Sequence, residues 1–153
     1  MQHRRGSNRL TETQLNASQS RTLSAGESET VSVDSRLHWN HSGIKAFQLE
    51  EYEISVPQGQ TWSDAGIVCG AAGQSGNWFQ SLFPWSKRVA SAPWFALIAT
   101  TDMQLTTPFV YAGAAANQFM IEIDGEILMF ANDAWIAYGN NSGAIKVLIK
   151  RIK

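Results

Sequence analysis

The stretch I-L-M-F-A-N-D-A-W-I-A-Y-G-N-N-S-G-A-I-K-V-L-I, residues 127–149, decides the fold expected for this chain. It consists of an apolar run (127–131), a polar segment (132–143) and a second run (145–149) with β-branched residues at alternate positions. Alternation with a period of two is typical of a half-buried strand. The stretch therefore predicts two strands joined by a polar loop.

The predicted loop is rich in side-chain oxygen atoms. Asp133, Asn140, Asn141 and Ser142 supply hard donors, and the loop has no Cys or His and only one formal charge. Such donors suit Ca²⁺ better than a transition metal. A cation held by so few protein groups keeps open coordination positions, which neighbouring sugar hydroxyls can fill. The alternative is that Gly-Asn-Asn-Ser-Gly only forms turns, because Gly and Asn adopt positive φ angles at little cost.

Short apolar or alternating runs continue on the N-terminal side of this stretch and predict further strands. They lie at residues 30–33, 44–47, 51–56, 67–69, 93–100, 108–113 and 119–123. The Asp124-Gly125 pair separates two such runs and predicts a β-hairpin. Eight or nine short strands with turns between them predict an all-β domain, and a two-sheet sandwich is the form expected at this size.

The composition divides the chain at about residue 28. Residues 1–28 are rich in Ser, Thr, Gln, Asn and Arg and have only isolated leucines, which predicts a disordered or loosely attached tail. Residues 29–153 form the predicted β-sandwich domain. A long stretch with many Gly and aromatic residues, 70–92, predicts an irregular loop that either forms the rim of a ligand site or plugs one end of the sandwich.

Charge and hydropathy exclude several classes of function. The net charge of −1 gives no reason to expect nucleic acid as a partner. No apolar run approaches the ~20 residues of a membrane span, and the N-terminus has no apolar segment typical of a signal peptide. A cytoplasmic location is the default expectation, with release or a surface role left open. The single cysteine, Cys69, allows no intrachain disulfide.

The C-terminal motifs resemble the bacterial calcium-dependent galactophilic lectins and the wider galactose-binding-like jelly-roll domains. The resemblance is carried by I-D-G-E-I-L-M-F-A-N-D (123–133), by D-A-W-I-A-Y-G-N-N-S-G (133–143) and by the run that follows it (144–149). More weakly, W-N-H-S-G-I (39–44) and P-W-F-A-L-I (93–98) resemble an opening motif and a central strand of related domains. The resemblance implies a two-sheet jelly-roll β-sandwich.

In that family an Asp and two adjacent Asn hold calcium through side-chain oxygens, and the matching residues here are Asp133, Asn140 and Asn141. Backbone carbonyls complete the protein ligands, and the matching positions are Ala137 and Ala65, which follows soon after Trp62. The resemblance implies that vicinal sugar hydroxyls fill the remaining positions and hydrogen-bond Asp133 and Asn140. Two aromatic side chains are additional candidates for contact with the sugar, namely Trp62 and Trp135.

Three departures from the family pattern bear on this expectation. Ala137 replaces a Thr whose side chain touches the sugar, and residues 62–93 contain no His to recognise a galactose hydroxymethyl group. Trp135-Ile136 replaces Pro-Gly in the loop. The Trp135 indole either stacks on a sugar or fills the space above the metal.

Two hypotheses of function remain. The first is a calcium-assisted module that binds a carbohydrate or glycoconjugate, with a homo-oligomer as the means to multivalent binding. The alternative is a non-catalytic structural or protein-interaction β-sandwich with a vestigial sugar site. An enzyme is not expected, because the sequence offers no nucleophile elbow or metal triad. Asp64 and Asp133 are the only pair that could be nominated for glycoside hydrolysis.

Overall fold

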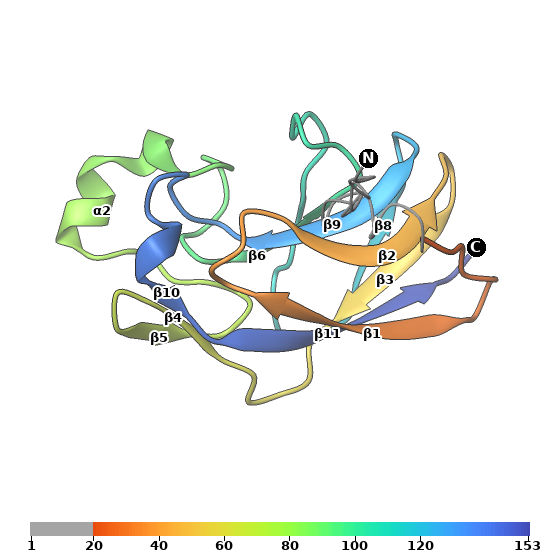
Figure 1. Ribbon diagram of the computed structural model, residues 1–153, viewed down its shortest axis with the longest axis horizontal. Helices are drawn as coiled ribbons and strands as arrows, with labels where there is room; N and C mark the ends of the chain where they lie inside the picture. Colours follow the sequence, from red (N-terminus) through yellow and green to blue (C-terminus); the bar gives the residue numbers. More distant parts are fainter. Residues whose placement is uncertain (1–19) are drawn as a thin grey trace, which may run out of the picture.

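The computed structural model describes residues 20–153, apart from the side chains of Trp78 and Phe79. Two four-stranded antiparallel sheets pack against each other around one main core, and a small three-stranded sheet lies at one end (Figure 1). Successive long strands alternate between the two large sheets, which is the arrangement of a jelly roll. The predicted all-β, two-sheet sandwich is therefore confirmed.

The first large sheet places the predicted C-terminal strand between two partners. Ile145, Val147 and Ile149 are fully buried, while the residues between them are exposed or half-buried, so the predicted alternation is confirmed. The strand order is β1-β11-β3-β8, with bounds Ser28–Asp34, Ala144–Arg151, Glu51–Ser55 and Asn117–Met120.

The second large sheet is covered on both faces around its central strand. Ile127 and Met129 of β9 face the main core, whereas Phe130 joins Ile98 and Val89 in a second apolar cluster on the other face. Burial of both faces explains why residues 127–131 form a continuous apolar run. The strand order is β2-β9-β6-β7, with bounds Asn40–Ala46, Gly125–Ala131, Leu97–Thr100 and Phe109–Val110.

The remaining elements gather at the end of the sandwich opposite the C-terminus, on the left in Figure 1. The small sheet has the order β10-β4-β5, with bounds Asn141–Ser142, Trp62–Asp64 and Ile67–Cys69. The helical turns are α2, η1 and η2, with bounds Trp78–Leu82, Pro84–Ser86 and Tyr138–Asn140. None of the helices in the described part of the chain is long and apolar enough to cross a membrane.

The predicted hairpin at Asp124-Gly125 is wrong. β8 pairs with β3, whereas β9 pairs with β2 and β6, so the strands on either side of this turn belong to different sheets. The turn is held by a hydrogen bond of 2.7 Å from the Gln48 amide to Asp124 Oδ1. A Cβ atom on Gly125 would lie 2.4 Å from the carbonyl oxygen of Thr101, so the chain needs glycine to cross between the layers here.

The packed domain begins before the expected boundary at residue 29. Leu23 is 1% exposed and belongs to the main core, and Arg21 forms a parallel bridge with Ile44. The expected tail at 1–28 therefore does not hold for its last residues, because an isolated leucine finds a buried site in the sandwich. The expectation for residues 1–19 lies outside the described residues.

Candidate functional site

The loop after β9 places Asp133 at the end of the sandwich with one oxygen unsatisfied. The preceding residue, Asn132, is fully buried and bonds the backbone of Val89 through both its amide oxygen and its amide nitrogen. Asp133 is 1% exposed, and its Oδ1 accepts a hydrogen bond of 2.7 Å from the Ala134 amide. Its Oδ2 is buried without a hydrogen-bond partner among the described residues. A buried carboxylate oxygen left in this way is costly.

Asn141 brings a second unsatisfied oxygen to the same place. It is 5% exposed and donates a hydrogen bond of 3.0 Å from Nδ2 to the carbonyl oxygen of Ser35. That bond fixes the orientation of the amide, and its Oδ1 is buried without a partner in the described part of the chain. The Asn141 side chain lies close enough to Asp133 to lower the pKa of that carboxyl, although burial outweighs this effect and raises the pKa.

A second carboxylate, Asp64, lies beside these two residues. It is directly opposite Asn141 in the β4–β10 pair and is 3% exposed. Gln80 Nε2 of α2 donates a hydrogen bond of 2.5 Å to Asp64 Oδ2. Burial raises the pKa of Asp64, and the charge of Asp64 contributes to the raised pKa of Asp133. The sequence nominates Asp64 only as half of a catalytic pair. Its approach to Asn141 depends on strand pairing between distant segments, which local sequence does not reveal.

The other predicted cation ligands lie on the exposed side of this cluster. The Ala65 amide donates a hydrogen bond of 3.2 Å to the carbonyl oxygen of Asn140, which ties the turn after β4 to the 133–141 loop. The Asn140 side chain is exposed, and the Ala137 carbonyl accepts a hydrogen bond of 3.2 Å from the Asn140 amide. Ala65 thus lies against Asn140, and the Asn141 side chain that follows it lies beside Asp133. The assignment of these residues as cation ligands stays a prediction.

The two tryptophans differ in their access to solvent. Trp62 is 2% exposed and packs edge-on against Phe95, with ring centroids 5.5 Å apart. Its indole belongs to the core. The expectation that Trp62 contacts a sugar is therefore wrong, because a buried ring cannot reach a ligand at the surface. Trp135 is 53% exposed and packs against His38, with ring centroids 4.1 Å apart, while His38 Nε2 lies 2.7 Å from the Trp135 carbonyl oxygen.

Arg88 holds the loop from the side of the 70–92 segment. Its backbone amide donates to the Asp133 carbonyl, and its Nη1 donates to the His38 carbonyl and, at 2.9 Å, to the Tyr138 hydroxyl. The guanidinium carbon lies 3.5, 4.1, 4.9 and 5.6 Å from the ring centroids of Phe130, Trp39, Trp135 and Tyr138. Burial lowers the pKa of Arg88. Cation–π contacts of this kind fix the planar guanidinium and the loop that surrounds it.

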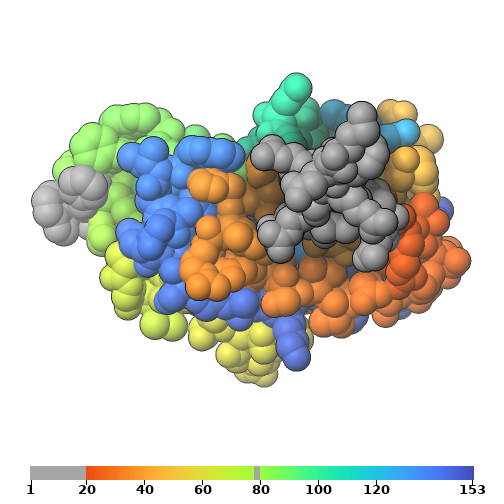
Figure 2. Space-filling view, viewed as in Figure 1, coloured from red at the N-terminus to blue at the C-terminus, as the bar shows by residue number. Residues whose placement is uncertain are grey.

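The chemistry available at this site is that of oxygen donors. Asp64 and Asp133 form no ion pair with any described Lys, Arg or His. Within residues 20–153 there is no group of three or more His, Cys, Asp or Glu side chains that could by itself hold a metal ion, so a cation here would depend on amide and backbone oxygens as well. The loop (blue) lies beside the segment around α2 (green) on the surface in Figure 2. Two buried carboxylates and an unsatisfied amide oxygen thus lie at this end of the sandwich, and none of the described Lys, Arg or His side chains forms an ion pair with either carboxylate.

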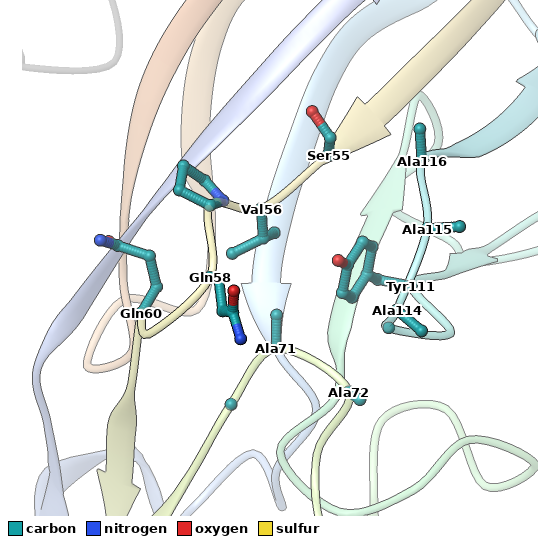
Figure 3. A pocket seen from close by; sticks show the side chains of 13 residues that line it. Ser55, Val56, Gln58, Gln60, Ala71, Ala72, Tyr111, Ala114, Ala115 and Ala116 are labelled. Carbon is teal, nitrogen blue, oxygen red and sulfur yellow. The ribbon is translucent and has the colours of Figure 1, made fainter.

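A separate open pocket of about 570 Å³ lies between the β3–β4 connection and the segment before β8 (Figure 3). Its lining is made of alanines, glycines, glutamines and a few other neutral residues, including Tyr111. None of the predicted site residues lines it. Without a charged side chain it offers neither an acid–base pair nor a strong cation ligand.

No protein-family model and no curated protein matches the sequence. Among solved structures, the chain is similar to the N-terminal domain of EclA, which is described as a PllA-like lectin. The TM-score is 0.55 at 15% sequence identity, and the match covers 80% of this chain and 94% of the other. A likeness at this level of identity concerns the fold. The chain therefore has a lectin-like β-sandwich fold.

Proposed function

We propose that this domain binds carbohydrate at the end formed by the 133–141 loop and β4, with the help of a calcium ion. The observation that carries the proposal is the pair of buried oxygens without partners among the described residues, Asp133 Oδ2 and Asn141 Oδ1. A hard cation would offset the cost of burying them. The similarity to a lectin domain is consistent with this function.

The residues present fit calcium. Asp133 and Asn141 would bind it from the buried side. The Asn140 side chain and the Ala65 and Ala137 carbonyls would bind it from the exposed side. The Ala137 carbonyl accepts a hydrogen bond from Asn140, but a carbonyl oxygen has a second lone pair. When bound, calcium supplies positive charge and open coordination positions that suit the vicinal hydroxyls of a sugar.

The exposed residues of the loop would contact the sugar. Asn140 can hydrogen-bond a hydroxyl, and the half-exposed Trp135 can offer its ring face, since its contact with His38 leaves part of the indole in solvent. A galactose-like ligand is the class to test first, because the loop resembles that of galactophilic lectins. Affinity per site should be weak, and a homo-oligomer would strengthen binding to clustered sugars.

Calorimetry tests the proposal directly. Calcium is titrated into the chelator-treated protein, and galactosides are then titrated with and without calcium. We expect heat from calcium alone and heat from the sugar only when calcium is present. No heat and no thermal shift at millimolar calcium would refute the proposal. Asp133→Ala, which removes the carboxylate, should abolish both signals.

A second function, an interaction module, is favoured by apolar side chains exposed around the same end. Ile136 is 96% exposed and Trp85 is 69% exposed, and the bridge between Lys87 and Ala134 brings their segments together. Such a surface suits contact with another protein. Light scattering with and without a chelator separates the two functions, because only a calcium-dependent assembly dissociates when the metal is removed.

Glycoside hydrolysis is not supported by the geometry. Asp64 and Asp133 are both almost fully buried, whereas a hydrolytic pair must reach both sides of a bound sugar. We propose a non-catalytic role for the domain.

A further inference from the structure

We propose that Asp64 is a second carboxylate ligand of the bound cation, held in place by Gln80 of α2. The inference rests on the proposed function and deepens it. It gives the site two negative charges from the protein, where the loop sequence alone offers one. It also makes the 70–92 segment part of the cation site, through a residue that the loop motif does not contain.

Strand pairing places Asp64 beside Asn141. Asp64 and Asn141 are directly opposite in the antiparallel β4–β10 pair, so their side chains lie on the same face of that small sheet. Both side chains are buried. Asn141 Oδ1 is one of the two buried oxygens without partners in the described chain, and the other belongs to Asp133. Asp64 and Asn141 therefore share one face of the small sheet, and the Asn141 side chain lies beside Asp133.

The charges of Asp64 and Asp133 favour a cation between them. Two carboxylates buried next to each other are unfavourable unless a positive group lies between them. None of the ion pairs within the described residues involves Asp64 or Asp133. Burial is the main cause of the raised pKa of Asp133, and the charge of Asp64 adds to it. A divalent cation would neutralise both.

Gln80 holds the Asp64 carboxylate through a hydrogen bond. Its Oε1 accepts a hydrogen bond of 3.0 Å from the Asn77 amide, which completes the capping box of α2, and its Nε2 donates to Asp64 Oδ2. With both ends of its amide engaged, Gln80 can hold Asp64 in only one orientation. Residues that orient metal ligands in this way typically contribute ~10–100-fold to metal affinity. Gln80 is thus a positioning residue.

Terbium luminescence and calcium calorimetry on the full chain test the inference. Asp64→Asn keeps the shape of the side chain and its contact with Gln80 but removes the charge. We expect this variant to bind calcium ~10–100-fold more weakly. The lifetime of bound Tb³⁺ in water and in heavy water reports the coordinated waters, and we expect an additional water in Asp64→Ala. Gln80→Ala should weaken binding without changing the water count.

The control is Glu122→Gln, which removes an exposed carboxylate near the opposite end of β9 and should leave calcium affinity unchanged. Thermal unfolding in chelator checks that each variant is folded, and Asp64→Ser serves if Asp64→Ala is not. Equal affinity and equal water counts in the wild type and the Asp64 variants would overturn this inference and leave the proposed function intact. Absence of calcium and terbium binding by the wild type would overturn both.

Discussion

Two buried aspartates determine how this protein should respond to pH. Burial raises the pKa of Asp64 and of Asp133 above the ordinary value of 3.8. Below that value both groups are neutral in the folded and the unfolded chain and cost nothing. As pH rises, the two carboxyls ionise first in the unfolded chain, which stabilises that chain relative to the folded one. The resulting loss of stability grows until pH exceeds the raised pKa values of the folded state and is constant above them.

We therefore expect the Asp64→Asn, Asp133→Asn double variant to gain stability over the calcium-free wild type as pH rises. Urea unfolding in chelator from about pH 3 to about pH 7 measures the difference. Aspartates with a lowered pKa, such as Asp34, act in the opposite direction but are common to both proteins, so they cancel. Calcium should raise the free energy of unfolding of the wild type most near neutral pH, where both carboxylates are most fully ionised. A difference that does not vary with pH would contradict the expectation.

Arg88 is a further residue on which the position of the 133–141 loop depends. Arg88→Lys should lower the free energy of unfolding by ~1–3 kcal/mol, because an ammonium cannot both stack on Phe130 and reach the Tyr138 hydroxyl. Urea unfolding provides the measurement. The matched control is Arg36→Lys, since Arg36 is exposed and forms its ion pair with Asp34, two residues away in the chain. An equally small effect of both substitutions would show that the aromatic contacts contribute little.

Among the secondary-structure elements, β9 links the core to the site. Its residues face two apolar clusters, and the strand leads directly into Asn132 and Asp133. Asn132 then bonds the backbone of Val89, so the loop cannot move away from the 70–92 segment without breaking buried hydrogen bonds. A rigid strand end of this kind can hold the coordinating oxygens of the loop in place before an ion or a sugar binds.

The turn before β9 gives a prediction at this scale. Gly125→Ala should destabilise the protein by ~1–3 kcal/mol, because the new methyl group would meet the Thr101 carbonyl and displace the start of β9 from the end of β6. Chemical denaturation followed by tryptophan fluorescence measures the loss. Gly70→Ala is the control, since the nearest atom to its new methyl group would be 3.8 Å away. If both variants unfold alike, the crossing of the chain at Gly125 is not tight.

At the scale of the whole molecule, the core extends to a residue that precedes the first strand. Leu23 is almost completely buried, whereas Leu37 is half exposed. Leu23→Ala should therefore cost ~2–5 kcal/mol of stability, and Leu37→Ala should cost well under ~1 kcal/mol. Thermal and urea unfolding of both variants measures the contrast. A small loss at Leu23 would restore the domain boundary near residue 29.

The amino-acid sequence by itself determined the class of the fold and placed three oxygen donors of the proposed site in one loop. Alternation in β11 reports one buried face, and this pattern survives in any packing that covers that face. Asp133, Asn140 and Asn141 lie within one short loop, so their closeness is largely a property of the chain itself. The predicted strands at 30–33 and 145–149 lie within β1 and β11, and the predicted strand at 51–56 corresponds to β3, which ends one residue earlier, at Ser55.

Only the tertiary structure decided which strands pair and which distant side chains meet. Asp124-Gly125 is equally suited to a hairpin and to a crossover, and the pairing of β8 with β3 and of β9 with β2 and β6 makes it a crossover. Trp62 is buried and Asp64 faces Asn141 because β4 pairs with β10, a segment from the other half of the chain. Periodicity is local, whereas register and burial depend on contacts between residues far apart in sequence.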